Sequence, residues 1–135
     1  VDYRGSLYAA VNSSSSGDTG RLWVRSPADG KWTVLESQAV GSYVWLTVFK
    51  GNLYVGRFTV GATTLRKYDG TTWSSPTTPS LSGLMANMFV DNGSIFIVNP
   101  GETLTVSTDG ASWSALRTIV APVSGQLYSV GVVSI

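Results

Sequence analysis

The sequence contains no cysteine and no histidine, and both absences exclude chemistry. Without them the chain has no disulfide framework, no thiolate or imidazole zinc site, and neither a Ser-His-Asp nor a Cys-His nucleophile system. Only 13% of the 135 residues are charged, and the formal net charge is +1. A nucleic-acid-binding protein needs a basic patch that neutralises phosphates, so we expect no nucleic-acid partner.

Long hydrophobic runs and helical patterns are also absent. The longest apolar runs have about the length of one strand, and no stretch combines a 3.6-residue period with helix caps. We therefore expect no helix and no membrane partner. A hydrophobic content of 43% is enough for a core. Together with the low charge and the many Ser, Thr and Gly residues, it predicts an exposed all-β protein, extracellular or on a virion or cell surface.

Regular spacings show that the chain repeats itself three times. Glycines lie 42 residues apart at Gly41, Gly83 and Gly125. Asp-Gly pairs recur every 40 residues, and a tryptophan follows each pair, at Trp32, Trp73 and Trp113. A period of this length is typical of propellers and other repeat architectures. We expect a single domain, 1–135, made of repeats at approximately 1–40, 41–82 and 83–124 and a closing strand in 125–135.

Each repeat contains four short strand candidates. In the middle repeat they are Tyr43–Phe49, Leu53–Phe58, Thr63–Tyr68 and a short strand that begins near Trp73. Alternation along the first of these predicts that Val44, Leu46 and Val48 share one apolar face. The counterparts elsewhere are Met85–Val90 and Leu127–Val133 for the first strand, Leu7–Val11 and Ile95–Val98 for the second, and Arg21–Arg25 and Thr103–Ser107 for the third. Turns such as Asn92-Gly93 predict hairpins between first and second strands.

The predicted unit is a four-stranded meander of about 42 residues, which is the blade that β-propellers repeat around a ring. Segments Leu46–Gly56 and Leu65–Ser74 resemble propeller repeats of the kelch-like and Asp-box (bacterial neuraminidase repeat) type. Ser107–Trp113 resembles an Asp box that lacks one residue between Asp and Gly. The resemblance covers essentially the whole chain and implies β-propeller blades. It says little about function, because unrelated activities use propellers.

A β-trefoil is the alternative fold. It also has three repeats of about this length, and it closes as a monomer. The order Gly-x-Leu-Tyr, Leu22-Trp23 and Gly30-Lys-Trp32 resembles the ricin-type trefoil lectin repeat. The Gln-x-Trp of that family is missing.

Three blades are too few to close a ring, since propellers have about four to eight. Residues 1–5 align with 47–51, so the first repeat lacks most of its first strand, whereas Leu127–Val133 is a surplus first strand. We expect this C-terminal strand to complete the first blade of another subunit, giving a homodimer with six blades. A trimer with nine blades, docking of the strand within its own chain, and excision from a longer propeller stay open.

Three of the eight acidic residues are predicted to have a structural role. Asp29, Asp69 and Asp109 recur once per repeat in Asp-Gly turns, where the carboxylate accepts hydrogen bonds from its own backbone and glycine supplies a positive φ. Glu36 and Glu102 are the pair that remains for a glycosidase, which needs two carboxylates about 5–10 Å apart, but both are expected to be surface charges. The acids are too scattered for a metal site, and no phosphate-binding loop is present, so we expect no catalytic residue, metal or cofactor.

The tryptophans fall into two groups. The repeated Trp32, Trp73 and Trp113 are predicted to pack each blade against its neighbour. Trp23 and Trp45 have no aromatic counterpart in the other repeats, and such variable positions suit stacking on a sugar face, with Arg25 and Arg57 as donors to its hydroxyls. In propeller lectins sugars lie between blades against Trp or Tyr with Arg and acidic partners, and the resemblance implies the same here. Trp45 is also compatible with a core position.

These observations predict a non-enzymatic binding module of the lectin-like propeller type, with a glycan ligand bound at Trp23, Arg25, Trp45 and Arg57. A structural or assembly protein, such as a virion or cell-surface decoration or attachment protein, is the alternative. A glycosidase is the least favoured of the three.

Overall fold

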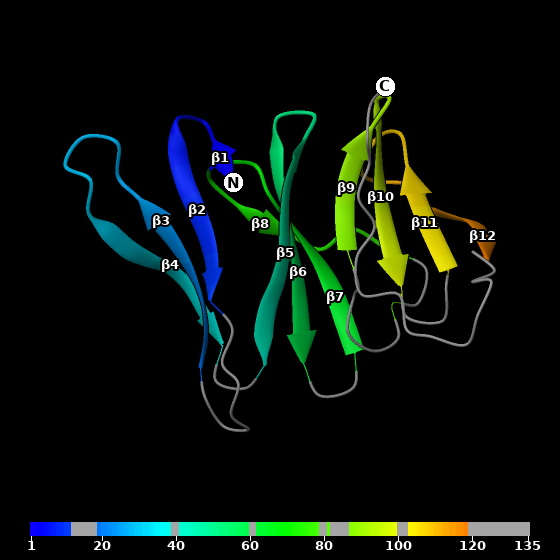
Figure 1. Ribbon diagram of the computed structural model, residues 1–135, viewed down its shortest axis with the longest axis horizontal. Coiled ribbons are helices and arrows are strands. Elements are labelled where there is room, and N and C mark those ends of the chain that lie inside the picture. Colours follow the sequence, from blue (N-terminus) through cyan, green and yellow to red (C-terminus); the bar gives the residue numbers. More distant parts are fainter. Residues whose placement is uncertain are drawn as a thin grey trace.

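The computed structural model describes residues 1–11, 19–38, 41–59, 62–78, 81, 87–99 and 103–118. Within these ranges the chain forms twelve β-strands and no helix, arranged as three four-stranded antiparallel sheets (Figure 1). The all-β class is therefore confirmed. The described part of the chain has no helix long and apolar enough to cross a membrane. The predicted closing strand Leu127–Val133 and Glu102 lie outside the described residues.

The strands of each sheet follow one another in chain order. The first sheet contains β1 (Asp2–Tyr3), β2 (Ser6–Val11), β3 (Gly20–Arg25) and β4 (Trp32–Gln38). The second contains β5 (Ser42–Phe49), β6 (Asn52–Thr59), β7 (Ala62–Tyr68) and β8 (Trp73–Ser74). The third contains β9 (Asn87–Asp91), β10 (Ser94–Asn99), β11 (Thr103–Ser107) and β12 (Ser114–Thr118). The predicted strands that fall on described residues are confirmed to within two residues, except that the fourth strand is short only in the second sheet.

The same two-residue turn joins the first two strands of every sheet. Its central residues are Arg4-Gly5, Lys50-Gly51 and Asn92-Gly93, all with positive φ. This geometry matches the right-handed twist of the paired strands, and Asn-Gly accommodates it best. Arg4 and Lys50 occupy the left-handed region at a cost of about 1–2 kcal/mol each. The hairpin prediction is confirmed, and the turn fixes which residues correspond between sheets.

The three sheets pack face to face in chain order, with β2 against β5 and β5 against β9 (Figure 1). Side chains of the first and second sheets form a first apolar cluster, with Tyr3, Tyr8, Leu22, Tyr43, Leu53 and Val55. Side chains of the second and third sheets form a second cluster, with Phe49, Tyr54, Leu65, Leu81, Met88, Ile95 and Ile97. Burial of each large side chain contributes about 1.5–3 kcal/mol, so these clusters hold the sheets together.

Two tyrosine hydroxyls also join neighbouring sheets. Tyr3 of the first sheet donates to the carbonyl of Gly51 at 3.0 Å or of Tyr68 at 3.3 Å, both in the second sheet. Tyr54 of the second sheet donates to the carbonyl of Gly110 at 3.2 Å, in the turn before β12 of the third. A buried phenol thereby satisfies its polar end while its ring packs in the cluster.

In strand β5 the side chains do not alternate regularly between the two faces of the sheet. Its pairing with β6 shifts between Tyr43 and Leu46, which marks a β-bulge. Val44 and Trp45 both pack on the second cluster, whereas Leu46 and Val48 pack on the first. The prediction that Val44, Leu46 and Val48 share a face is therefore wrong, because an extra residue in one strand reverses the facing of the residues beyond it.

The repeated tryptophans behave as predicted in two of three cases. Trp73 packs on the first cluster and stacks on Tyr68, with ring centroids 4.7 Å apart. Trp113 packs on the second cluster, edge-on to Tyr54 at 6.5 Å. Trp32 is 41% exposed and belongs to neither cluster, so the packing prediction is wrong for this residue. Its face of the first sheet carries no further sheet within the described residues.

Candidate functional site

The second sheet differs from the first at its outer edge. In the first sheet β4 pairs along the whole of β3, whereas β8 pairs only Tyr68 and Lys67 of β7. Pro76 follows β8, and a proline has no N–H to donate to a ladder. Beside this less paired part of β7 lies an open depression of about 590 Å³. Its lining includes Arg57, Thr64, Arg66, Ser75, Thr77 and Leu81.

Two arginines of the depression are held in place by the first sheet. Arg57 donates through Nε to Oε1 of Gln38, and Gln38, which is buried, donates in turn to the carbonyl of Phe58 at 3.3 Å. Arg66 forms an ion pair with Glu36, with Nη1 and Oε1 2.5 Å apart. The guanidinium of Arg66 also lies 4.8 Å from the ring centroid of Trp73. Charge-assisted bonds and cation–π contact fix both groups, so little entropy is lost when they bind a ligand.

Glu36 is not the surface charge expected from the sequence. Its side chain is 21% exposed and points to Arg66 of the next sheet. The hydroxyl of Tyr43 and Oε2 of Glu36 are buried, and neither has a hydrogen-bond partner in the described part of the chain. Burial, and then the negative charge of Glu36, raise the pKa of Tyr43 to about 12. Tyr43 therefore stays neutral at ordinary pH beside the ion pair.

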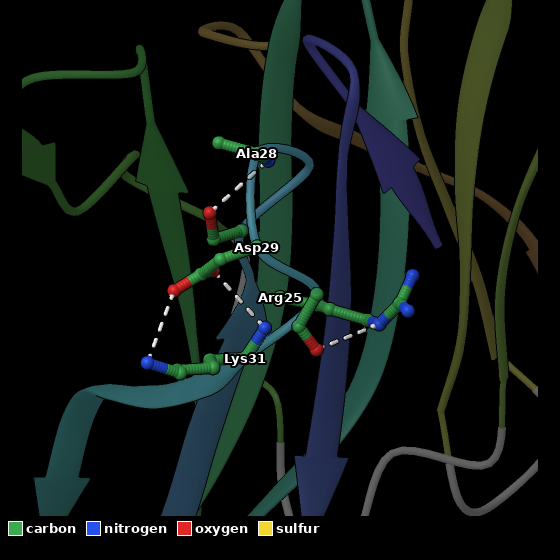
Figure 2. Close-up of polar contacts among 6 residues, drawn as sticks. Arg25, Ala28, Asp29 and Lys31 are labelled. Atoms are coloured by element: carbon green, nitrogen blue, oxygen red, sulfur yellow. Dashed lines mark hydrogen bonds and ion pairs between the residues drawn. The ribbon is translucent and has the colours of Figure 1, made fainter.

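The three Asp-Gly turns confirm the structural role predicted for their carboxylates. In the first turn Oδ1 of Asp29 accepts from the backbone N–H of Lys31 at 3.1 Å, and the Lys31 ammonium lies 3.7 Å from Oδ2 (Figure 2). Asp69 accepts from the N–H groups of Thr71 and Thr72, both at 2.8 Å. Asp109 accepts from those of Ala111 at 2.8 Å and Ser112 at 2.7 Å. Gly30, Gly70 and Gly110 all have positive φ.

These backbone hydrogen bonds stabilise the ionised carboxylates. They lower the pKa of Asp69 to about 2 and hold the pKa values of Asp29 and Asp109 below their usual range. A carboxylic acid kept ionised in this way is a poor proton donor. No group of acidic residues in the described ranges is arranged to hold a metal ion.

The four predicted ligand residues do not meet at one place. Trp23 and Arg25 lie two positions apart on β3 and so share one face of the first sheet, where Arg25 donates to the carbonyl of Gly30 at 3.1 Å (Figure 2). Trp45 is partly buried against the second cluster. Only Arg57 lines the depression.

Arg66 and the hydroxyl residues of the depression were not predicted. The signal was present in the sequence, because prolines follow Trp73 at positions 76 and 79, whereas no proline comes so soon after Trp32 or Trp113. Arg66 also stands at a variable position, where the register places Trp23 in the first sheet and Thr105 in the third.

No protein-family model matches the chain, and no curated protein matches it. The interpretation of the site therefore depends on its own geometry.

Proposed function

We propose that the chain is a non-enzymatic carbohydrate-binding module built from β-propeller blades. Each described strand pairs only within its own sheet, and the sheets pack face to face, with β2 against β5 and β5 against β9. Repeated four-stranded sheets around a common axis have this arrangement. In a β-trefoil the repeats would share one barrel, which the separate sheets do not favour.

The observation that carries the proposal is the pair of fixed arginines in the depression of the second sheet. Arg57 and Arg66 offer guanidinium donors, while Thr64, Ser75 and Thr77 offer hydroxyls that donate and accept. Pro76 adds apolar surface for the C–H face of a sugar ring. A volume of about 590 Å³ lies within the range of small-molecule sites, about 300–1,000 Å³.

The distribution of carboxylates supports binding over hydrolysis. Glycoside hydrolysis needs two carboxyl groups on opposite sides of the scissile bond, one of them able to donate a proton. Among the described residues, no Asp or Glu lines the depression. Asp29, Asp69 and Asp109 bond their own turns, and Glu36 pairs with Arg66.

A glycan array probed with the labelled chain tests this function. We expect at least one sugar to bind, and Arg57→Ala to weaken that binding tenfold or more, because one charged hydrogen bond of about 1.5–3 kcal/mol is lost. Lys31→Ala, which removes an exposed cation outside the depression, should bind as the unmodified chain does. An array without any binding, or equal loss in both variants, would contradict the proposal.

A structural or assembly role is the second candidate, and a separate observation favours it. The first sheet exposes large apolar side chains on the face that carries Trp32. Contiguous apolar surface of this kind marks interaction sites in soluble proteins. A chain that binds no sugar and still associates through that face would have this second role.

A further inference from the structure

The charges of the chain are unevenly distributed along the sequence. Residues 37–90 contain four basic residues and one acidic residue, although the formal net charge of the whole chain is +1. The acidic residue is Asp69, whose carboxylate accepts hydrogen bonds from the backbone of its own turn. This stretch includes the second sheet and the depression beside β7. The depression therefore lies in a basic part of the molecule.

The charges of the two arginines in the depression are balanced to different degrees. Arg66 is paired with the carboxylate of Glu36, with Nη1 and Oε1 2.5 Å apart. In the described part of the chain the guanidinium of Arg57 has one partner, the neutral amide of Gln38, whose Oε1 accepts from Nε. No described Asp or Glu forms an ion pair with Arg57. Its positive charge is thus not balanced by a carboxylate of the described residues.

The contact with Gln38 fixes Arg57 and uses few of its donors. A guanidinium carries five N–H donors, and this contact uses the one on Nε. The N–H groups on the Nη atoms have no acceptor among the described residues. Arg57 is partly exposed and lines the depression. Parallel N–H groups of a guanidinium match two oxygens of one carboxylate or sulfate group, so Arg57 is suited to an anionic ligand.

The rest of the polar lining is neutral. The hydroxyls of Thr64, Ser75, Thr77 and Thr78 can each donate or accept a hydrogen bond. A neutral sugar would satisfy these hydroxyls, but it would displace water from Arg57 without balancing the charge of its guanidinium. Removal of an unpaired charge from water costs free energy, whereas an anionic group removes this cost by pairing with it. The lining therefore favours a negatively charged sugar over a neutral one.

We propose that the depression binds an anionic glycan, with a carboxylate or sulfate group of the sugar paired with Arg57. The hydroxyls of Thr64, Ser75 and Thr77 bind neighbouring hydroxyl groups of the same sugar. Arg66 stays paired with Glu36, so Arg57 supplies the charge that distinguishes an anionic sugar from a neutral one. This inference rests on the proposed carbohydrate binding and adds the charge of the ligand.

Matched forms of the same sugars test the charge of the ligand. Galactose and glucose are immobilised in their neutral, uronate and 6-sulfate forms, and binding of the labelled chain to each form is measured. The uronate or the 6-sulfate of at least one sugar should bind tenfold or more tightly than its neutral form, and the stronger of the two identifies the anionic group. Equal binding of all forms would overturn the inference and leave carbohydrate binding intact. Absence of binding to every form would overturn the inference, and absence of binding on the general glycan array as well would contradict both proposals.

A matched pair of variants separates a specific contact from general attraction. Arg57→Gln and Lys67→Gln each remove one positive charge from the second sheet, but Lys67 does not line the depression. Arg57→Gln should weaken binding of the anionic form tenfold or more and affect the neutral form less, whereas Lys67→Gln should leave both unchanged. Equal losses in the two variants would overturn the assignment of Arg57.

Salt dependence tests the inference on the unmodified chain, independently of how the variants fold. An increase from about 0.05 M to about 0.5 M sodium chloride should weaken binding of the anionic form and change that of the neutral form little, because salt screens charges. The same salt dependence for both forms would contradict a charge pair in the site.

Discussion

At the scale of single residues, the carboxylates of the Asp-Gly turns stabilise the turns in which they lie. Asp69 and Asp109 are solvent-exposed, yet each binds two backbone N–H groups of its own turn. The ionised carboxylate accepts these hydrogen bonds more strongly than the protonated form does, which is why the pKa of Asp69 falls to about 2 and that of Asp109 falls as well. The repeated motif in the sequence was enough to predict this role.

The lowered pKa values predict a loss of stability in acid. A carboxyl group whose pKa is lower in the folded state than its ordinary value of about 3.9 stabilises the fold above that pH. This contribution decreases as pH falls from about 4 toward the folded-state pKa of about 2. The Tm should therefore drop over this range, and Asp69→Asn should lower the Tm at pH 7 and flatten the acid dependence. Asp2→Asn, at an exposed strand position, is the control; identical pH profiles for the two variants would contradict the account.

Gly110 illustrates a residue whose lack of a side chain permits a contact between sheets. It has a positive φ of 76°, and a Cβ there would collide with the hydroxyl of Tyr54 from the second sheet. Gly51 has a similar φ of 71° and open space around it. Alanine at Gly51 would introduce backbone strain alone, whereas alanine at Gly110 would add a collision. Comparison of the two variants therefore separates the two effects.

We expect Gly51→Ala to lower the free energy of unfolding by about 1 kcal/mol through backbone strain alone. Gly110→Ala should lower it by about 3 kcal/mol, because collision adds to the strain. In a Tyr54→Phe background the difference should shrink. Urea denaturation measures all of these values. Equal losses at Gly51 and Gly110 would show that the Tyr54 contact is not tight.

At the scale of strands and sheets, the hydrophobic pattern predicted most of the elements and their order. The three meanders follow from alternating strands and from two turns whose residues accept positive φ. The bulge in β5 was not predictable, since Val44 and Trp45 both suit an apolar face and nothing local marks the extra residue. The short β8 was predictable from Pro76, whereas the partners of Arg57 and Arg66 were not. Gln38 and Glu36 lie far from them in sequence and meet them only through packing of the sheets.

The ion pair between Glu36 and Arg66 should be worth more than a surface pair. Both side chains are largely buried, whereas those of Asp29 and Lys31 are exposed. Glu36→Gln leaves the Arg66 guanidinium without its charged partner and should lower the free energy of unfolding by about 1–3 kcal/mol. Lys31→Gln should change it little. A double-mutant cycle with Arg66→Met isolates the pair, and a coupling near zero would contradict its role between the sheets.

At the scale of the whole molecule, three sheets repeat one packing, and within the described residues no further sheet covers the face of the first sheet that carries Trp32. From the internal repeat we predicted that Trp32, Trp73 and Trp113 all pack against a neighbouring sheet. Trp73 and Trp113 do so, but Trp32 is exposed, because no described sheet covers its side of the first sheet. Trp23 and Arg25, predicted as ligand residues, lie on that uncovered side. Whether a position is core or surface here depends on the neighbouring sheet, which the local sequence does not contain.

The native mass of the unmodified chain in solution tests this account most directly. Light scattering behind a sizing column, over a range of concentrations, compares that mass with the 14.3 kDa of one chain. The account predicts a mass of two or more chains, because a second chain that covers the exposed apolar side chains of the first sheet removes them from water. A stable monomer at the highest concentration, with Leu7, Trp32 and Val34 still open to solvent, would contradict it.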